Sequence, residues 1–439
     1  MSARRGAAAR VEAWLARAST PAFSGYATAA AFVAYFAMYA VRKPFAAAPF
    51  AGTAVFGLDL KIALVLGQVL GYALSKFLGI KFVSEISPRH RPLALVGLIA
   101  AAELALLAFA VLPPGGQVVA MFCNGLPLGA VWGLVFGFLE GRRTTELLGA
   151  GLSTSYIVAS GAVKSVGRWL LTQGVSEAWM PSLTGLLFMP AFALAVWLLA
   201  RLPRPTETDE AARTRREPMF AAQRLAFVRR FSLGILVLTA AHVMLTAYRD
   251  FRDNFAAELW HALGYGDAPA MFTYSEIPVA LAVVAGLAAI YRVRDNRRAF
   301  FAVHGLMVGG AVLVAGSTAL FELGVVSGPT WMIAIGIGLY LGYVPFGTVL
   351  FDRLIAATGA VGTAVFMIYV TDAFGYLGSI GVLLFKNFAH ADLSWIDFFL
   401  GFSYVCGLAG AAAFAGSAWY FARRTGPATP QGPAPIEPR

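Results

Sequence analysis

Long apolar segments recur along the whole chain, and short polar turns separate them. Six such segments precede one long polar stretch, and six follow it. A membrane-spanning helix needs about 20 predominantly apolar residues, so each segment is predicted to be a transmembrane helix. The predicted helices cover residues 24–42, 60–82, 92–112, 117–139, 147–172, 180–201, 231–250, 271–291, 299–321, 329–351, 360–386 and 395–422.

The long polar stretch, residues 203–230, divides the chain into two halves. It holds an acidic run followed by arginines, and it has too few apolar residues to bury itself. We therefore predict an all-α polytopic membrane protein with two pseudo-symmetric six-helix halves, residues 24–202 and 231–422, joined by a cytosolic linker. A basic N-terminal segment, residues 1–23, and a tail, residues 423–439, complete the chain.

Composition and charge agree with this topology. Of the 439 residues, 59% are hydrophobic and 13% are charged, against roughly 25% charged in soluble domains. The formal charge is +11, and 25 of the 34 lysines and arginines lie in loops and tails on one side of the predicted membrane. Short cytosolic loops carry such an excess, so both termini are predicted to be cytosolic, in a cytoplasmic membrane. The charge then reflects topology and not nucleic-acid binding.

The N-terminal 20 residues lack an apolar run followed by a small-residue cleavage site, so a signal peptide is not predicted. Val11, Trp14, Leu15 and Ala18 would share one face of a helix. That pattern predicts a short helix lying on membrane lipid. The alternative is a mobile basic tail.

Cations also occur where a membrane interior is expected, and there they cost several kcal/mol unless they face a polar cavity. Residues three or four apart share a helix face. Three predicted helices carry tyrosines and cations on one face, namely Tyr35, Tyr39, Arg42 and Lys43 on the first, Gln68, Tyr72, Ser75 and Lys76 on the second, and Tyr156, Ser160, Lys164 and Arg168 on the fifth. These stacks predict a cationic cavity. The alternative is that the cations extend from helix ends to the membrane surface.

The second half adds charges of both signs. The seventh helix carries His242, Thr246, Arg249, Asp250, Arg252, Asp253, Asn254 and Phe255. These residues belong either to the cavity or to a local ion-pair cluster at the outer surface. Asp372 lies in the middle of the eleventh helix, with Tyr376 and Ser379 on the same face, and is expected to pair with Arg249, with Arg252 or with a proton.

Glu103, central in the apolar third helix, is a second candidate proton carrier. Its alternative is a protonated carboxyl that is hydrogen-bonded between helices.

Several features argue against other chemistries. The two cysteines lie in apolar segments, and the five histidines show no metal-ligand spacing. No Walker motif is present, and Gly336, Gly338 and Gly342 follow no strand, so nucleotide binding is not predicted. We expect neither a metal nor another cofactor. Glycines at every fourth position predict close helix packing on the fourth helix, at Gly125, Gly129, Gly133 and Gly137.

The motifs at the ends of the first two helices resemble those of the organophosphate:phosphate antiporters, which belong to the major facilitator superfamily. They are Tyr39-Ala-Val-Arg42-Lys43-Pro-Phe45 and Tyr72-Ala-Leu-Ser75-Lys76-Phe77. Residues 79–91, with Glu85 and Arg89, are similar to a degenerate form of that superfamily's gating-loop motif. Gly362-Thr363-Ala364 and Phe374-Gly375-Tyr376-Leu377-Gly378 resemble the family's eleventh helix.

This resemblance implies that Arg42 and an arginine of the seventh helix bind the substrate phosphate, with Lys76 nearby. Arg249 is preferred over Arg252 because Asp253-Asn254-Phe255 follows it at the family's spacing. The resemblance leaves Tyr39, Tyr72, Tyr376, Lys164 and Arg168 as further candidate substrate contacts. The sequence departs from the family on the fifth helix, where the expected histidine has no counterpart.

A secondary transporter of a small anionic solute is therefore expected, plausibly exchanging a phosphorylated metabolite for phosphate, as a monomer. One alternative is a proton-coupled carboxylate transporter, in which Asp372 or Glu103 carries the proton. A second is a sensor that binds its ligand without flux. A membrane enzyme is not expected, because the cytosolic loops are short and hold no paired catalytic residues.

Overall fold

The computed structural model describes residues 2–55, 57–142, 144–205, 209, 229–358, 364–389 and 392–424. Within them, each predicted transmembrane segment has a helix, and two segments are divided into two consecutive helices. The first half contains α2 (Thr20–Ala40), α3 (Leu60–Glu85), α4 (Arg91–Val111), α5 (Pro114–Leu128), α6 (Val131–Phe136), α7 (Thr145–Thr172) and α8 (Met180–Leu199). The second half contains α11 (Ser232–Asn254), α13 (Met271–Tyr274), α14 (Glu276–Tyr291), α15 (Asn296–Glu322), α16 (Gly328–Thr348), α18 (Ala364–Ala389) and α19 (Trp395–Ala422).

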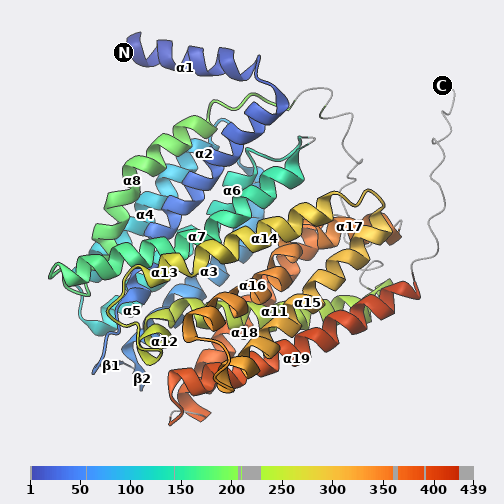
Figure 1. The fold of residues 1–439 in the computed structure, drawn as a ribbon. Coiled ribbons are helices and arrows are strands. Elements are labelled where there is room, and N and C mark those ends of the chain that lie inside the picture. The colour runs from blue at the N-terminus through green and yellow to red at the C-terminus, as the bar shows by residue number, and fades with distance from the viewer. Residues whose placement is uncertain are drawn as a thin grey trace.

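Shorter elements complete the described chain. They are α1 (Ser2–Leu15), the 3-10 helix η1 (Pro44–Ala47), α12 (Ala256–Ala262), α17 (Leu350–Thr358), and the strands β1 (Ala54–Val55) and β2 (Leu58–Asp59). The strands pair antiparallel, with Ala54 opposite Asp59. This hairpin lies at the end of the molecule opposite α1, as Figure 1 shows. We call these two ends the hairpin end and the α1 end.

The helices form two bundles that follow the two halves of the sequence (Figure 1). Within the first bundle α3 packs on α5 and α2 packs on α7 and α8, while α15 packs on α16 and α19 in the second. The two bundles meet where α3 contacts α18 and where α7 contacts α13 and α14. A central cavity can form between the α3–α18 contact and the contact of α7 with α13 and α14.

The outer surface of both bundles is apolar. Leu93 is 72% exposed, and Leu104, Leu236 and Leu408 are each 65% exposed. Eight helices among the described residues are long and apolar enough to cross a membrane. Since such exposed leucines are tolerated in lipid but not in water, the chain is an integral membrane protein.

Several helix boundaries differ from the sequence prediction, and two of the differences follow from prolines. The first helix ends at Ala40 and not at Arg42, because Pro44 has no N–H to donate to the Ala40 carbonyl. The fourth helix divides at Gly129 and Ala130, where Pro127 removes another backbone donor. Arg42 and Lys43 therefore lie in a turn, which lets consecutive side chains take different directions.

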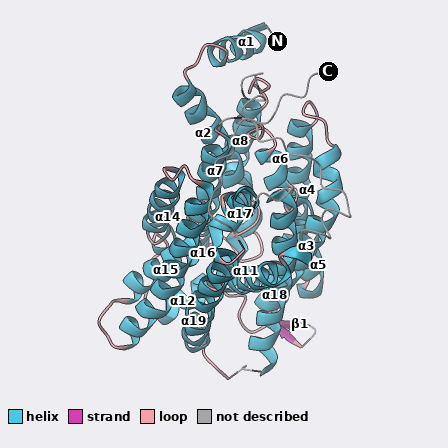
Figure 2. Cartoon of the chain, turned by 90° about the vertical axis from the view of Figure 1, so that its right-hand side faces the viewer, coloured by secondary structure: helices cyan, strands magenta, loops and turns pink. Residues whose placement is uncertain are grey.

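The N-terminal segment forms a helix, the first of the two predicted arrangements. α1 lies across the end of the first bundle (Figure 2). Trp14 contacts Tyr26 with ring centroids 6.0 Å apart, and Glu12 pairs with Arg201 at 3.1 Å. Of the predicted lipid-facing residues, Leu15 is buried and Trp14 is 49% exposed. These contacts hold α1 against the bundle, and its contact with lipid stays a prediction.

Some predicted features lie outside the described residues. These are most of the linker (206–208 and 210–228), the tail beyond Arg424, and Gly362 and Thr363 of the pattern on the eleventh helix.

Glycines bring α3 and α5 into close contact, as their spacing predicts. A Cβ atom added at Gly71 would lie 2.1 Å from the carbonyl oxygen of Phe122, and one added at Gly125 would lie 2.2 Å from that of Gln68. Gly129 likewise faces Ser75 at 2.6 Å. Side chains larger than hydrogen would push the two helices apart at these positions.

The substitution Gly125→Ala tests this contact. It should lower the free energy of unfolding by about 1–3 kcal/mol, because the added methyl group overlaps a backbone carbonyl that cannot move alone. The thermal unfolding midpoint in detergent measures the effect. Gly97→Ala on α4 is the matched control, since nothing lies within 4 Å of the added atom. Equal midpoints for the two variants would contradict the close contact.

Candidate functional site

A cavity of about 590 Å³, its mouth included, lies between the two bundles. The first half lines it with Tyr35, Tyr39, Arg42, Tyr72, Lys76, Trp132, Ser153 and Tyr156. The second half lines it with His242, Arg249, Tyr343, Val344, Gly347, Ile368, Asp372 and Tyr376. Six tyrosines and three cations thus share one space, and both halves contribute to it.

Arg42 is the cation in this cavity that lacks a carboxylate partner. Its side chain is 6% exposed, and no described carboxylate lies within ion-pair distance. The guanidinium carbon lies 4.0 Å from the ring centroid of Tyr72 and 5.6 Å from that of Tyr39. The buried Nε atom has no hydrogen-bond partner. A cation–π contact offsets only part of the cost of burying a charge, so this site is suited to an anion.

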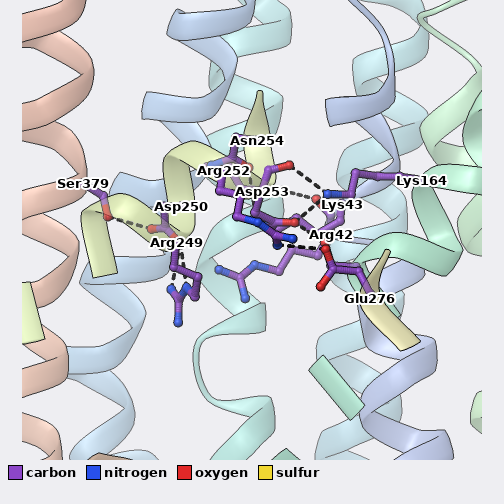
Figure 3. A network of polar contacts seen from close by, with 12 residues as sticks. Arg42, Lys43, Lys164, Arg249, Asp250, Arg252, Asp253, Asn254, Glu276 and Ser379 are labelled. Atoms are coloured by element: carbon purple, nitrogen blue, oxygen red, sulfur yellow. Dashed lines mark hydrogen bonds and ion pairs between the residues drawn. The ribbon is translucent and has the colours of Figure 1, made fainter. Parts of the chain in front are cut away.

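Arg249 faces the same cavity from α11, and its charge is partly neutralised. It pairs with its neighbour Asp250 at 2.7 Å and donates a hydrogen bond to the hydroxyl of Tyr343. Its guanidinium carbon lies 4.5 Å from the centroid of the Tyr343 ring and 6.0 Å from that of Tyr376. In Figure 3 the guanidinium groups of Arg42 and Arg249 extend to the same region. One arginine from each half therefore reaches the cavity.

Asp372 connects the two halves, but not through the predicted partners. Its Oδ2 atom lies 3.5 Å from the Lys76 ammonium, and its Oδ1 atom lies 3.2 Å from Nε2 of His242. The expected partner was Arg249, Arg252 or a proton. The two arginines are wrong as partners because they already have their own carboxylates, Asp250 and Glu276, and the proton stays a prediction.

His242 and Tyr343 complete the cavity wall. The sequence placed His242 either in the cavity or in a local ion-pair cluster, and it did not point to Tyr343. Their rings stack with centroids 5.1 Å apart, and Phe346 packs on His242 at 4.6 Å. A signal for His242 was present, because it precedes Arg249 by two helical turns and so shares its face. Tyr343 had no comparable signal, since only the fold brings α16 to this wall.

Asp253 forms a second polar cluster, which joins the two halves outside the cavity wall. It pairs with Lys43 and with Lys164, each at 2.6 Å, and accepts a hydrogen bond from Ser160. Lys43 also donates to the side chain of Asn254 at 2.8 Å. Lys43, Lys164 and Ser160 belong to the first half, while Asp253 belongs to the second (Figure 3). We call these residues the Asp253 cluster.

Four candidate cavity cations therefore lie elsewhere, and Lys43 of the Asp253 cluster is the first of them. Lys164 belongs to the Asp253 cluster. Arg252 pairs with Glu276 at 2.8 Å and donates to the carbonyl of Met332 at 3.0 Å, inside the second half. Arg168 donates to the carbonyl of Gly266 at 3.2 Å in a loop at the hairpin end. Helical spacing placed Lys164 and Arg168 on the same face of α7 as Tyr156. At the level of these two cations, however, that face of α7 meets Asp253 of α11 and the helix α13.

The remaining candidates also lie outside the cavity wall. Glu103 is buried between α4 and α8, where its Oε1 atom accepts a hydrogen bond from Ser182 at 2.6 Å, and its Oε2 atom has no partner. This matches the interhelical arrangement that was the alternative for Glu103. Glu85 and Arg89 are exposed after the last turn of α3, and a gating role for them stays a prediction.

Comparison with solved structures defines the class of protein. The crystal structure of a D-xylose-proton symporter matches with a TM-score of 0.62 and 12% identity, over 90% of this chain and 96% of that one. At this identity the likeness shows the fold, an all-α membrane fold of two halves, as predicted. Membership in the major facilitator superfamily stays a prediction.

Comparison with family models then identifies the family. The chain belongs to the Family of unknown function (DUF5690), whose model matches residues 44–424. A search among curated proteins found no match. Membership in the organophosphate:phosphate antiporter branch stays a prediction.

The substitution Asp253→Asn tests whether the Asp253 cluster holds the hairpin end closed. Without this carboxylate Lys43 and Lys164 would face each other unneutralised, and breaking such a buried pair costs about 3–5 kcal/mol. Spin labels on the Ala51→Cys and Ala262→Cys variants, exposed positions in opposite halves, should report longer distances by pulsed electron paramagnetic resonance.

The two native cysteines, Cys123 and Cys406, are first replaced by serine. Glu322→Gln serves as the control, because Glu322 only meets Tyr404 on the exposed surface of its own half. An unchanged distance distribution in the Asp253→Asn variant would show that other contacts keep this end closed.

Proposed function

We propose that this protein is a secondary transporter that carries a small anionic solute by alternating access. The observation that supports this most directly is the buried guanidinium of Arg42, which faces the cavity without a described carboxylate partner. An uncompensated charge out of water is unfavourable by several kcal/mol, and a bound anion would remove that cost. A site of this kind is expected where the ligand supplies the missing charge.

The ligand class that fits best is a phosphate or a phosphate monoester. Arg42 and Arg249 offer planar guanidinium groups that can each donate two hydrogen bonds to tetrahedral oxygens. Tyrosine rings cover a face of each guanidinium, and the edge of Arg42 remains for the ligand. Arg249 already donates from Nε and Nη2 to Asp250 and from Nη1 to Tyr343, which leaves one hydrogen on each terminal nitrogen for the ligand. Asp250 and Asp372 already neutralise Arg249 and Lys76, so the cavity has about one positive charge to spare.

The same geometry favours exchange over free movement of the empty carrier. With an anion bound, one cation from each half is attracted to it, which draws the halves together. Without the anion, the charge on Arg42 opposes closure around an empty cavity. We therefore favour exchange of a phosphorylated metabolite for phosphate, with the positively charged α1 end facing the cytosol and the hairpin end facing out.

In this proposal the state described is closed toward the outside. Opening that side must separate Asp253 from Lys43 and Lys164. Ligand binding between Arg42 and Arg249 would lower the barrier to the rearrangement, because it replaces repulsion by attraction at the adjacent cavity.

A second candidate function rests on the contact of Asp372 with Lys76 and His242. Protonation of this carboxylate would release Lys76 and loosen the link between α3 and α18. A proton could then drive transport of an organic anion such as a carboxylate. The similar structure is that of a D-xylose-proton symporter, which supports proton coupling as a possibility for this fold.

Radiolabelled phosphate exchange in proteoliposomes preloaded with phosphate tests the primary proposal. Arg42→Ala should reduce exchange about a hundredfold, the loss expected when ~3 kcal/mol of charge-assisted hydrogen bonding is removed. Arg423→Ala, at an exposed arginine beside Trp419, is the control and should exchange normally. Phosphate binding without flux in the wild-type protein would instead identify a sensor, and absence of binding would refute an anion site for phosphate.

The variant Asp372→Asn separates the two coupling modes. For phosphate exchange it should tighten phosphate binding several-fold, because Lys76 loses its carboxylate and becomes available to the anion. For proton-coupled uptake it should abolish accumulation driven by a pH gradient while leaving counterflow intact. Uptake of phosphate and of carboxylates, with and without an imposed gradient, measures both. Unchanged kinetics in every assay would exclude Asp372 from either mode.

A further inference from the structure

Two buried side-chain amides lie directly behind Arg42, on the side away from the cavity. Gln68 on α3 donates from Nε2 to the backbone carbonyl of Arg42 at 2.9 Å. Asn124 on α5 donates from Nδ2 to the carbonyl of Val41 at 2.9 Å and to that of Ala102 at 3.0 Å. The two amides also join each other, since Gln68 donates to Oδ1 of Asn124 at 2.8 Å. Both side chains are at most 3% exposed.

These amides bind backbone carbonyls just after α2, where no backbone N–H group is available to donate to them. α2 ends at Ala40, and the N–H groups of Arg42 and Lys43 both turn back to the Tyr39 carbonyl. Pro44 has no N–H, and the N–H of Ala46 donates to the Lys43 carbonyl. The carbonyls of Val41 and Arg42 would thus be buried without a helical partner. Gln68 and Asn124 supply the missing donors and define the conformation of this turn.

The conformation of the turn decides which cation enters the cavity. Arg42 lines the cavity, whereas its neighbour Lys43 points to Asp253 and Asn254 in the cluster at the hairpin end. A small rotation of this turn would move both side chains at once. Neither amide touches the cavity, so any effect on the ligand passes through Arg42.

We propose that Gln68 and Asn124 are positioning residues, which hold the turn after α2 so that Arg42 faces the anion site and Lys43 faces the Asp253 cluster. This proposal rests on the proposed function only in taking Arg42 as the anion-binding group. Gln68 and Asn124 belong to the same half as Arg42. Their hydrogen bonds do not cross the boundary between the halves, so Arg42 keeps its direction when the halves move apart.

Close packing of α3 and α5 makes this arrangement possible. Gly125, next to Asn124, lies against the backbone of Gln68, with only 2.2 Å between an added Cβ atom and the Gln68 carbonyl oxygen. At that separation two short amide side chains can meet and still reach α2. A wider contact would leave a gap that only water could fill.

Phosphate affinity of the purified full-length protein gives the first test, by titration calorimetry. Gln68→Met and Asn124→Leu keep the side-chain volume but remove the donors. Each should weaken phosphate binding about tenfold, the equivalent of ~1.4 kcal/mol, while the maximal exchange rate at saturating phosphate changes much less. Gln117→Met is the matched control, since Gln117 is a buried amide of α5 that donates to the Phe109 carbonyl and not to the turn after α2. Wild-type affinity in both amide variants would overturn the proposal.

A second test does not depend on the ligand. In a background with Cys123 and Cys406 replaced by serine, thiols are introduced by Arg42→Cys or Lys43→Cys. A small charged methanethiosulfonate should label the first thiol at least about tenfold faster than the second, a ratio worth ~1.4 kcal/mol. Gln68→Met and Asn124→Leu together should bring the two rates close, whereas Gln117→Met should not.

The two tests separate this proposal from the proposed function. If wild-type protein binds no phosphate, the anion site for phosphate fails, and the labelling ratio still decides whether the amides orient the turn. If phosphate binds and Arg42→Ala abolishes binding, but the amide variants match the wild type in affinity and labelling ratio, then Gln68 and Asn124 are not positioning residues.

Discussion

A guanidinium held out of water without a carboxylate partner is the constraint around which this structure is arranged. Arg42 is 6% exposed, and its guanidinium lies against the rings of Tyr39 and Tyr72. A guanidinium in this place needs a turn that holds its direction and aromatic rings that partly replace water around it. It also needs a route by which a ligand can reach it. The break in α2, the two buried amides and the cavity between the halves meet these three requirements.

The other cations near the boundary of the two halves differ from Arg42 in having carboxylate partners. Each of them has a carboxylate within 4 Å, including Lys43, Lys61, Lys76, Lys164, Arg168, Arg249 and Arg252. Several of these pairs join the first half to the second. The pairs of Lys43, Lys61, Lys164 and Arg168 lie outside the cavity, toward the hairpin end. Ion pairs of this kind are bistable contacts, because they are made fully or lost to water as the halves move. Arg42 thus differs from these cations, because no described carboxylate pairs with it.

The helix α11 contributes to both the cavity and the Asp253 cluster, because its side chains point in different directions. Along α11, Arg249 faces the cavity, Asp250 faces Ser379 of α18, Arg252 faces Glu276 of α14, and Asp253 faces the first half. A helix turns about 100° per residue, so neighbours in the sequence reach different helices. Any ligand-induced rotation of α11 would therefore change the anion site and the Asp253 cluster together.

The sequence by itself determined the twelve spans, the two halves and the helix faces that carry tyrosines and cations, because apolar length and helical period are local properties. Arg42, Lys76 and Asp372 were found in this way, whereas Arg249 was preferred because of the resemblance to the organophosphate:phosphate antiporters. Tertiary structure alone decided that Asp372 meets Lys76 and His242, that Lys164 leaves the cavity for Asp253, and that Gln68 and Asn124 reach the turn after α2. An ion pair or hydrogen bond needs two atoms within 4 Å, and that depends on the tilt, depth and rotation of two helices at once. Glycine contacts such as the one between α3 and α5 set those quantities, and no pattern within one helix encodes them.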